Sequence, residues 1–147
     1  MLIQAYCDGA ARGQGQTKDK VEASCATVIF RNGVEVARYA RGLGRRSNNE
    51  AEYEAVITAL LICSMADLPD PIIYTDSAVV ANQVSGKWAC RNEELLPLLL
   101  SVQTIQSEFR FRIEQVSRKV KGIALADLYA NEFLDQLAEA KASLPKK

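Results

Sequence analysis

The sequence predicts an α/β domain in which helices pack against a mixed β-sheet. Three β-rich runs open the chain, and Asn32-Gly33 between the second and the third is a strong signal for a two-residue hairpin. A helical period of apolar residues follows from about Asn49, and a short apolar run comes after it. Because crossover connections are right-handed, we expect the strand after the helix to lie beside the first strand and parallel to it.

The three opening strands are expected at residues 2–7, 24–30 and 34–41. The first of them ends at Asp8-Gly9, after which Gly13 and Gly15 indicate a loop that extends through Lys18 and Lys20. The hairpin makes the three strands an antiparallel meander. These bounds place Asp8 at the end of a strand.

A long helix is expected from about residue 49 to residue 67. Ser47-x-x-Glu50 and Asn49-x-x-Glu52 both resemble capping boxes, so the first helical residue stays open. Glu52 lies on the same helical face as Val56 and Leu60, the face expected to pack on the sheet. A carboxylate on that face needs a hydrogen bond or a metal ion, unless Glu52 completes the second capping box in an exposed position.

The fourth strand is expected at residues 72–75, and Asp76 follows it directly, as Asp8 follows the first strand. Neighbouring strands lie ~4.8 Å apart, so side chains at the matched ends of two parallel strands converge. We therefore expect Asp8 and Asp76 to face each other. With Glu52 they would offer hard oxygen ligands, which suit Mg²⁺ or Mn²⁺.

The second half should add two helices, a strand and a last helix. Ser77 is expected to cap a short helix that ends near Gly86. The remaining elements are expected at residues 93–107 (helix), 109–114 (half-exposed strand) and 123–142 (helix). No repeat or linker interrupts the chain, which predicts a single domain over residues 1–147 with a basic tail from about residue 143.

Composition excludes several kinds of site. The chain has no histidine, which excludes a Ser-His-Asp or Cys-His hydrolase, and its four cysteines stand singly, which argues against zinc. No glycine-rich stretch completes a nucleotide-binding fingerprint. The formal net charge is zero, but Lys and Arg are absent from residues 47–86 and frequent on both sides of that stretch. Such a pattern suits metal ions at the centre and phosphates along the flanks.

No run approaches the ~20 apolar residues of a membrane span, and no charged amino-terminal segment precedes an apolar one. We therefore expect no membrane partner. Unpaired cysteines fit the reducing cytoplasm, where we expect the protein to be located. We also expect it to be a monomer.

Four blocks of the sequence resemble type 1 ribonuclease H. They read Tyr6-Cys7-Asp8-Gly9-Ala10-Ala11-Arg12-Gly13, Ser47-Asn48-Asn49-Glu50-Ala51-Glu52, Tyr74-Thr75-Asp76-Ser77 and Ala126-Asp127-Leu128-Tyr129-Ala130-Asn131. The blocks occur in the order of that family and span nearly the whole chain. The resemblance implies a five-stranded mixed sheet of order 3-2-1-4-5, in which strand 2 is antiparallel and helices cover both faces.

By this resemblance, the four metal-binding acids are Asp8, Glu52, Asp76 and Asp127. Taken alone, Asp127 is more typical of a capping or helix-dipole acid. The implied activity is hydrolysis of the RNA strand of an RNA/DNA hybrid with two Mg²⁺ or Mn²⁺ ions. One ion would activate water and the other would steady the departing 3′ oxygen, which leaves 5′-phosphate and 3′-hydroxyl ends.

The resemblance also implies further site residues. Arg118 is similar to an arginine that histidine-free relatives use in catalysis. The implied substrate-binding residues are Gly9, Arg12, Gln14, Asn48, Asn49, Ser77, Lys87, Trp88 and Asn92. Polar groups among them would read 2′-hydroxyls in the wide minor groove of the hybrid. Taken alone, Trp88 fits a core or edge aromatic.

Three departures from the family pattern affect the expected activity. The loop after Asp8 lacks the usual Asn and Pro, no histidine precedes the fourth acid, and Gly122 or Ile123 stands where an Asn is usual. We therefore expect reduced or Mn²⁺-favoured activity. Two alternatives stay open, a non-catalytic nucleic-acid-binding module of the same fold and a structure-specific DNA nuclease.

Overall fold

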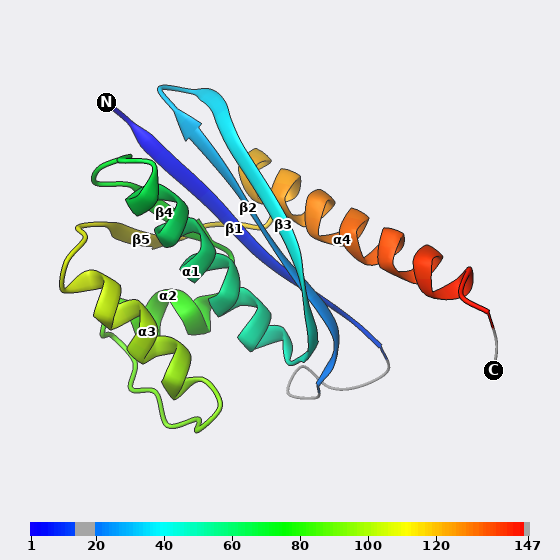
Figure 1. Ribbon diagram of the computed structural model, residues 1–147. Coiled ribbons are helices and arrows are strands. Elements are labelled where there is room, and N and C mark those ends of the chain that lie inside the picture. The colour runs from blue at the N-terminus through cyan, green and yellow to red at the C-terminus, as the bar shows by residue number, and fades with distance from the viewer. Residues whose placement is uncertain (14–19, 146–147) are drawn as a thin grey trace.

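A five-stranded sheet forms the centre of the molecule in the computed structural model, which describes residues 1–13 and 20–145 (Figure 1). The elements are β1 (Ile3–Arg12), β2 (Val21–Arg31), β3 (Val34–Arg46), α1 (Asn48–Met65), β4 (Ile72–Thr75), α2 (Ala78–Val84), α3 (Leu96–Gln106), β5 (Arg112–Gln115) and α4 (Lys121–Ala142). Most of the glycine-rich loop, with Gln14 and Lys18, and the last two lysines of the basic tail lie outside the described residues.

The strand order is β3-β2-β1-β4-β5. β2 runs antiparallel to β1 and β3, whereas β1, β4 and β5 run parallel to one another. Both residues of the β2–β3 turn have positive φ, 51° at Asn32 and 82° at Gly33, as a type I′ hairpin turn requires. The predicted sheet order, antiparallel strand and hairpin are therefore confirmed.

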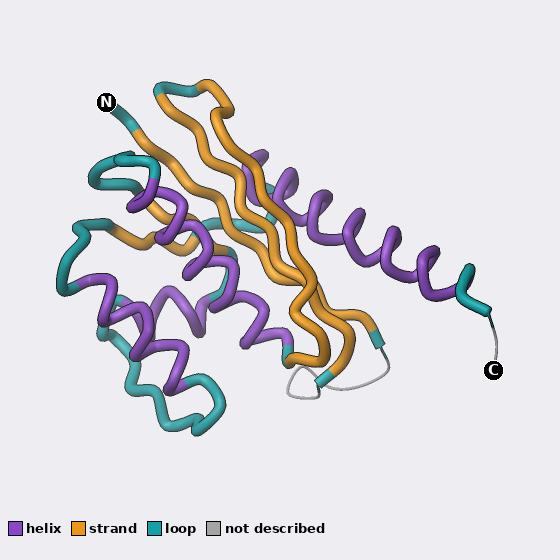
Figure 2. The backbone as a smooth tube through the Cα atoms, viewed as in Figure 1, coloured by secondary structure: helices purple, strands orange, loops and turns teal. Residues whose placement is uncertain are grey.

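Helices cover both faces of the sheet, as predicted (Figure 2). On one face, Ile3, Ala5 and Cys7 of β1 pack in a core that includes residues of α1, α2 and α3. On the other face, Ala10 of β1 packs with Ala126, Ala130 and Leu134 of α4. Alternate residues of β1 thus face opposite layers. Of the helices described, none combines the length and the apolar character that a membrane crossing needs.

The predicted end of the first strand at Asp8 is wrong. β1 continues to Arg12, because Gly9 to Arg12 pair with residues 22–25 of β2. What ends near Asp8 is the parallel pairing with β4, whose last pair is Cys7 with Thr75. A notch therefore opens in the sheet where β1 runs on without a neighbour on that side, and both Asp8 and Asp76 directly follow this last pair.

The structure also decides between the two capping boxes of the long helix. Ser47 caps α1, accepting a hydrogen bond from the Glu50 N–H, and the Glu50 side chain accepts one from the Ser47 N–H. Glu52 is instead buried, with 5% of its surface exposed. The exposed capping role considered for Glu52 is therefore wrong.

Other element bounds differ from the prediction for local reasons. β2 and β3 are longer because their pairing extends to Val21 and Arg46. α3 begins at Leu96 rather than at residue 93, after a turn in which the Asn92 side chain accepts hydrogen bonds from two backbone N–H groups. β5 begins only at Arg112, where its pairing with Ile72 starts.

Candidate metal centre

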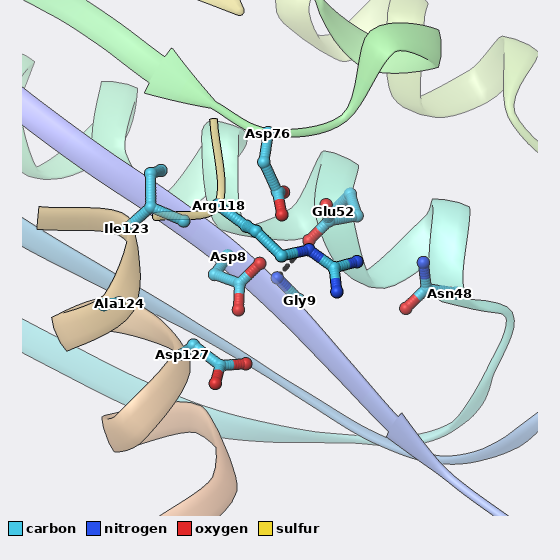
Figure 3. A pocket seen from close by; sticks show the side chains of 9 residues that line it. All are labelled: Asp8, Gly9, Asn48, Glu52, Asp76, Arg118, Ile123, Ala124 and Asp127. Carbon is cyan, nitrogen blue, oxygen red and sulfur yellow. Dashed lines mark hydrogen bonds between the residues drawn. The ribbon is translucent and has the colours of Figure 1, made fainter. Parts of the chain in front are cut away.

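A pocket of about 300 Å³ lies at the notch beside β1 (Figure 3). It is lined by Asp8, Gly9, Asn48, Glu52, Asp76, Arg118, Ile123, Ala124 and Asp127. The four predicted acids thus line one pocket, although they come from β1, α1, the segment after β4, and α4.

Three of the acids form a tight group. One carboxylate oxygen each of Asp8, Glu52 and Asp76 lies within 4.8 Å of the other two. Asp8 and Glu52 are both buried, and Asp76 is half-buried. Glu52 comes from the face of the sheet covered by α1, and it meets the other two acids at the notch.

Gly9 explains how α1 comes so close to β1. Its N–H donates a hydrogen bond to the Glu52 carboxylate. A Cβ at this position would lie 2.5 Å from the backbone carbon of Ala51 and 2.6 Å from the Glu52 nitrogen. Only a glycine allows this approach, so Gly9 positions Glu52.

The electrostatics of the group are those of crowded, buried carboxylates. Burial raises the pKa of Asp8 to about 8, and the neighbouring Asp127 and Asp76 side chains add to the shift. Burial also raises the pKa of Glu52 well above its ordinary value, followed by repulsion from Asp8 and Asp76. A positive charge placed among the three acids would relieve both effects.

Asp76 supplies a direct test of whether a metal ion fits here. Its Oδ1 atom is buried and has no hydrogen-bond partner among the described residues. A buried acceptor of this kind is rare in folded proteins, since it loses water without gaining a partner. Three carboxylate oxygens with one unsatisfied atom match the ligands that Mg²⁺ and Mn²⁺ prefer.

Asp127 lines the pocket but stands apart from the group of three. Its side chain is exposed on the second turn of α4. The Asn131 Nδ2 atom donates to Asp127 Oδ1 at 3.1 Å and to its backbone oxygen at 2.9 Å. The fourth acid therefore has a hydrogen-bond partner, unlike Asp76 Oδ1.

Two further predicted residues line the pocket, Arg118 and Asn48. Arg118 reaches across it from the segment between β5 and α4, and Asn48 lies at the first turn of α1 (Figure 3). Arg118 is the cationic residue among those that line the pocket, and Asn48 is a neutral donor and acceptor at its rim.

The other predicted substrate-binding residues do not line the pocket. These are Arg12, Asn49, Ser77, Lys87, Trp88 and Asn92, while Gln14 lies outside the described residues. Ser77 caps α2 by accepting from the Val80 N–H. Trp88 is 49% exposed, so of its two interpretations, as a core or an edge aromatic, the core position is wrong.

Two positions gained roles that the sequence did not indicate. Gly122 lies against the Tyr6 ring, and a Cβ at this position would come within 2.3 Å of a ring carbon. Glycine therefore lets the start of α4 pack closely against β1. Asn131, four residues after Asp127, bonds the fourth acid. The spacing of four on one helix was the available signal, because such residues are neighbours on its surface.

Sequence and structure comparisons agree on the family. The sequence profile of a family described as "Reverse transcriptase-like" matches residues 11–132. The bifunctional protein Rv2228c of Mycobacterium tuberculosis is 31% identical over 146 residues, covering 97% of this chain. The match spans only 38% of that mycobacterial protein's length.

Solved structures give the same result. The crystal structure of RNase H1 from the archaeon Halobacterium salinarum superposes with a TM-score of 0.84 at 30% identity, covering 92% of this chain and 99% of that one. LC11-RNase H1, solved in complex with an RNA/DNA hybrid, gives 0.83 at 26% identity, with 92% and 99% covered. The chain belongs to the ribonuclease H-like family.

Proposed function

We propose that this protein hydrolyses the RNA strand of RNA/DNA hybrids with divalent ions held by Asp8, Glu52, Asp76 and Asp127. The observation that carries the proposal is the group of three carboxylates, with oxygens within 4.8 Å of one another and one buried oxygen left without a partner. The hybrid bound in the LC11-RNase H1 structure supports the choice of substrate.

The acids would hold two Mg²⁺ or Mn²⁺ ions, with Asp127 completing the set from the α4 side. When bound, such ions lower the pKa of a water nucleophile and stabilise charge on the departing oxygen, so the products would carry 5′-phosphate and 3′-hydroxyl ends. Gly9 orients Glu52 through its N–H. These carboxylates thus supply the ligands in a fixed geometry.

The remaining pocket residues would bind and orient the hybrid. Asn48 can donate to or accept from a 2′-hydroxyl, the group that distinguishes RNA from DNA. Arg118 places a permanent positive charge beside the scissile phosphate and compensates charge that develops there. Lys87 and Trp88 lie outside the pocket, and we propose that they contact the DNA strand.

A cleavage assay with matched substrates tests the proposal. Labelled RNA/DNA hybrid, double-stranded RNA, double-stranded DNA and a four-way DNA junction are each incubated with Mg²⁺ or Mn²⁺. We expect cleavage of the hybrid alone, confined to its RNA strand, with Mn²⁺ favoured over Mg²⁺. Asp76→Asn should abolish it, whereas Asp67→Asn, at an exposed turn with a φ of 55°, should not.

Each other result selects a different function. Hybrid binding without cleavage, together with no Mn²⁺ binding, would indicate a non-catalytic module. Cleavage of the junction in preference to the hybrid would indicate a structure-specific DNA nuclease. Equal hybrid cleavage by wild type and Asp76→Asn would show that the acids do not carry the activity.

A further inference from the structure

We propose that Asn131, held by Arg12, positions the carboxylate of Asp127. This inference rests on the proposed function, because it concerns the acid that would complete the metal site. It also assigns Arg12 a different role from the substrate contact that the family resemblance implied. In the proposed arrangement, Arg12 is a positioning residue that acts through Asn131.

A continuous set of hydrogen bonds joins Arg12 to Asp127. The Arg12 Nη2 atom donates to Asn131 Oδ1 at 3.0 Å and to the Asn131 backbone oxygen at 3.1 Å. Asn131 Nδ2 in turn donates to Asp127 Oδ1 at 3.1 Å. Arg12 Nη1 forms an ion pair with Asp135 Oδ1 at 2.6 Å, one turn further along α4.

The chemistry of the three groups fixes which way the Asn131 amide faces. A guanidinium group only donates hydrogen bonds, so it must meet the amide oxygen. The amide NH₂ is then left facing Asp127, whose carboxylate only accepts. The reversed amide would set NH₂ against the guanidinium and oxygen against the carboxylate. Arg12 therefore ensures that Asp127 receives a donor.

The location of this relay, by which we mean the hydrogen bonds that run from Arg12 through Asn131 to Asp127, gives it a function beyond stability. Arg12 lies on β1, four residues after Asp8, whereas Asn131 and Asp127 lie on α4. The exposed Asp127 side chain would otherwise be free to change rotamer. The relay ties it to the strand that carries Asp8, so the fourth acid is held toward the group of three.

Asn131→Ala is the primary test. We expect kcat on RNA/DNA hybrid to fall about tenfold, with an unchanged KM, because groups that orient metal ligands typically have effects of this size. Mn²⁺ affinity without substrate, measured by calorimetry, should weaken by a similar factor of about ten. Arg12→Met should act in the same direction by about threefold, because Asn131 can still bond Asp127 directly.

Two controls separate positioning from general destabilisation. Glu132→Gln changes the exposed neighbour of Asn131 and should match wild type in kcat, Mn²⁺ affinity and melting temperature. In an Asp127→Asn background, Asn131→Ala should cause no further loss of kcat, because residues that act as one unit are non-additive. A purely structural effect would instead add to that of Asp127→Asn.

The opposing outcomes are distinct. A raised KM with unchanged Mn²⁺ affinity in both Asn131→Ala and Arg12→Met would overturn the proposal and make these residues substrate contacts. Wild-type values of kcat and Mn²⁺ affinity in Asn131→Ala would also overturn it while leaving the proposed function intact. A wild-type protein that neither cleaves hybrid nor binds Mn²⁺ would remove the proposed function itself, and with it the inference.

Discussion

The carboxylates on two sides of the same pocket differ in burial and in hydrogen-bond partners. On the side of β1, α1 and β4, Asp8 and Glu52 are buried with raised pKa values, and Asp76 keeps a buried oxygen without a partner. On the side of α4, Asp127 is exposed and accepts a hydrogen bond from Asn131. Both sides are bordered by β1, so the difference lies in solvation and in partners.

The contrast separates two contributions to such a site. The buried group of three concentrates negative charge where water is scarce, which favours binding of a cation and opposes folding without one. Asp127 adds a ligand from solvent, where its charge is hydrated and hardly opposes folding. The buried group of three therefore depends on a bound cation, whereas Asp127 depends on the residues that orient its side chain.

The largest expected effect comes from removing one charge on each side in turn. Asp8→Asn should lower kcat on hybrid by on the order of 10³-fold, since it removes a preorganised charge from the buried group. The same change should raise the unfolding free energy of the metal-free protein by roughly 1–3 kcal/mol at pH 8, because a buried carboxylate disappears. Asp127→Asn should lower kcat by about 10–100-fold without that gain in stability.

Steady-state cleavage and chemical denaturation in EDTA measure the two quantities on the same samples. If Asp8→Asn proved less stable than wild type in EDTA at pH 8, the carboxylates would not be in repulsion. A gain in stability from Asp127→Asn equal to that from Asp8→Asn would remove the contrast between the two sides.

The next effect is a pH dependence of stability in the metal-free protein. The folded pKa of Asp8 is raised from 3.8 to about 8, so between these values the folded state holds a proton that the unfolded state has released. The contribution of Asp8 to stability is then fully present below pH 3.8 and is lost as the pH rises toward 8, by up to about 1.4 kcal/mol per pH unit for each such proton. The melting temperature in EDTA should drop by about 3–5 °C per pH unit over this window.

Variants on the two sides should differ in this slope. Asp8→Asn should flatten it, and Asp127→Asn should reduce it in part, because Asp127 contributes to the raised pKa of Asp8. The exposed control Asp67→Asn should leave it unchanged. Mn²⁺ should raise the melting temperature more at pH 8 than at pH 5.5, because the ion competes with protons for the same oxygens. A wild-type melting temperature that rises with pH in EDTA would contradict the assignment of the shift.

Sequence patterns predicted the meander and the place of the fourth strand, whereas the place of the fifth strand came from the resemblance. The Asn32-Gly33 hairpin and the right-handed crossover suffice to place β4 beside β1. The predicted end of β1 was wrong because long-range pairing with β2 outweighed the glycine signals after Asp8. Asp8 and Asp76 nevertheless meet as expected, since the shared feature is the end of the β1–β4 pairing rather than the end of both strands.

Asp8 and Asp76 were predictable from strand ends, and beyond them the site was predictable only where a residue broke a local pattern. Glu52 stood out as an acid on an apolar helical face, whereas Asp127, an exposed acid on an amphipathic helix, breaks no pattern and came from the resemblance alone. The relay from Arg12 to Asn131 joins residues 119 positions apart. No spacing rule reaches that far, and side-chain hydrogen bonds of this kind need the packed structure.

A smaller effect than those on the two sides of the pocket should come from a region outside both. Trp88 is 49% exposed and its neighbour Lys87 is exposed, so neither supports the core. Trp88→Ala should raise the KM for hybrid by about fivefold, the low end of what an aromatic contact contributes to nucleic-acid binding. It should leave kcat, Mn²⁺ affinity and the pH dependence of the melting temperature unchanged, because none of these depends on the contact with the DNA strand. A fall in kcat at constant KM would show that Trp88 affects the four carboxylates. The distinction between a substrate-binding region at Lys87 and Trp88 and a catalytic region at the pocket would then be lost.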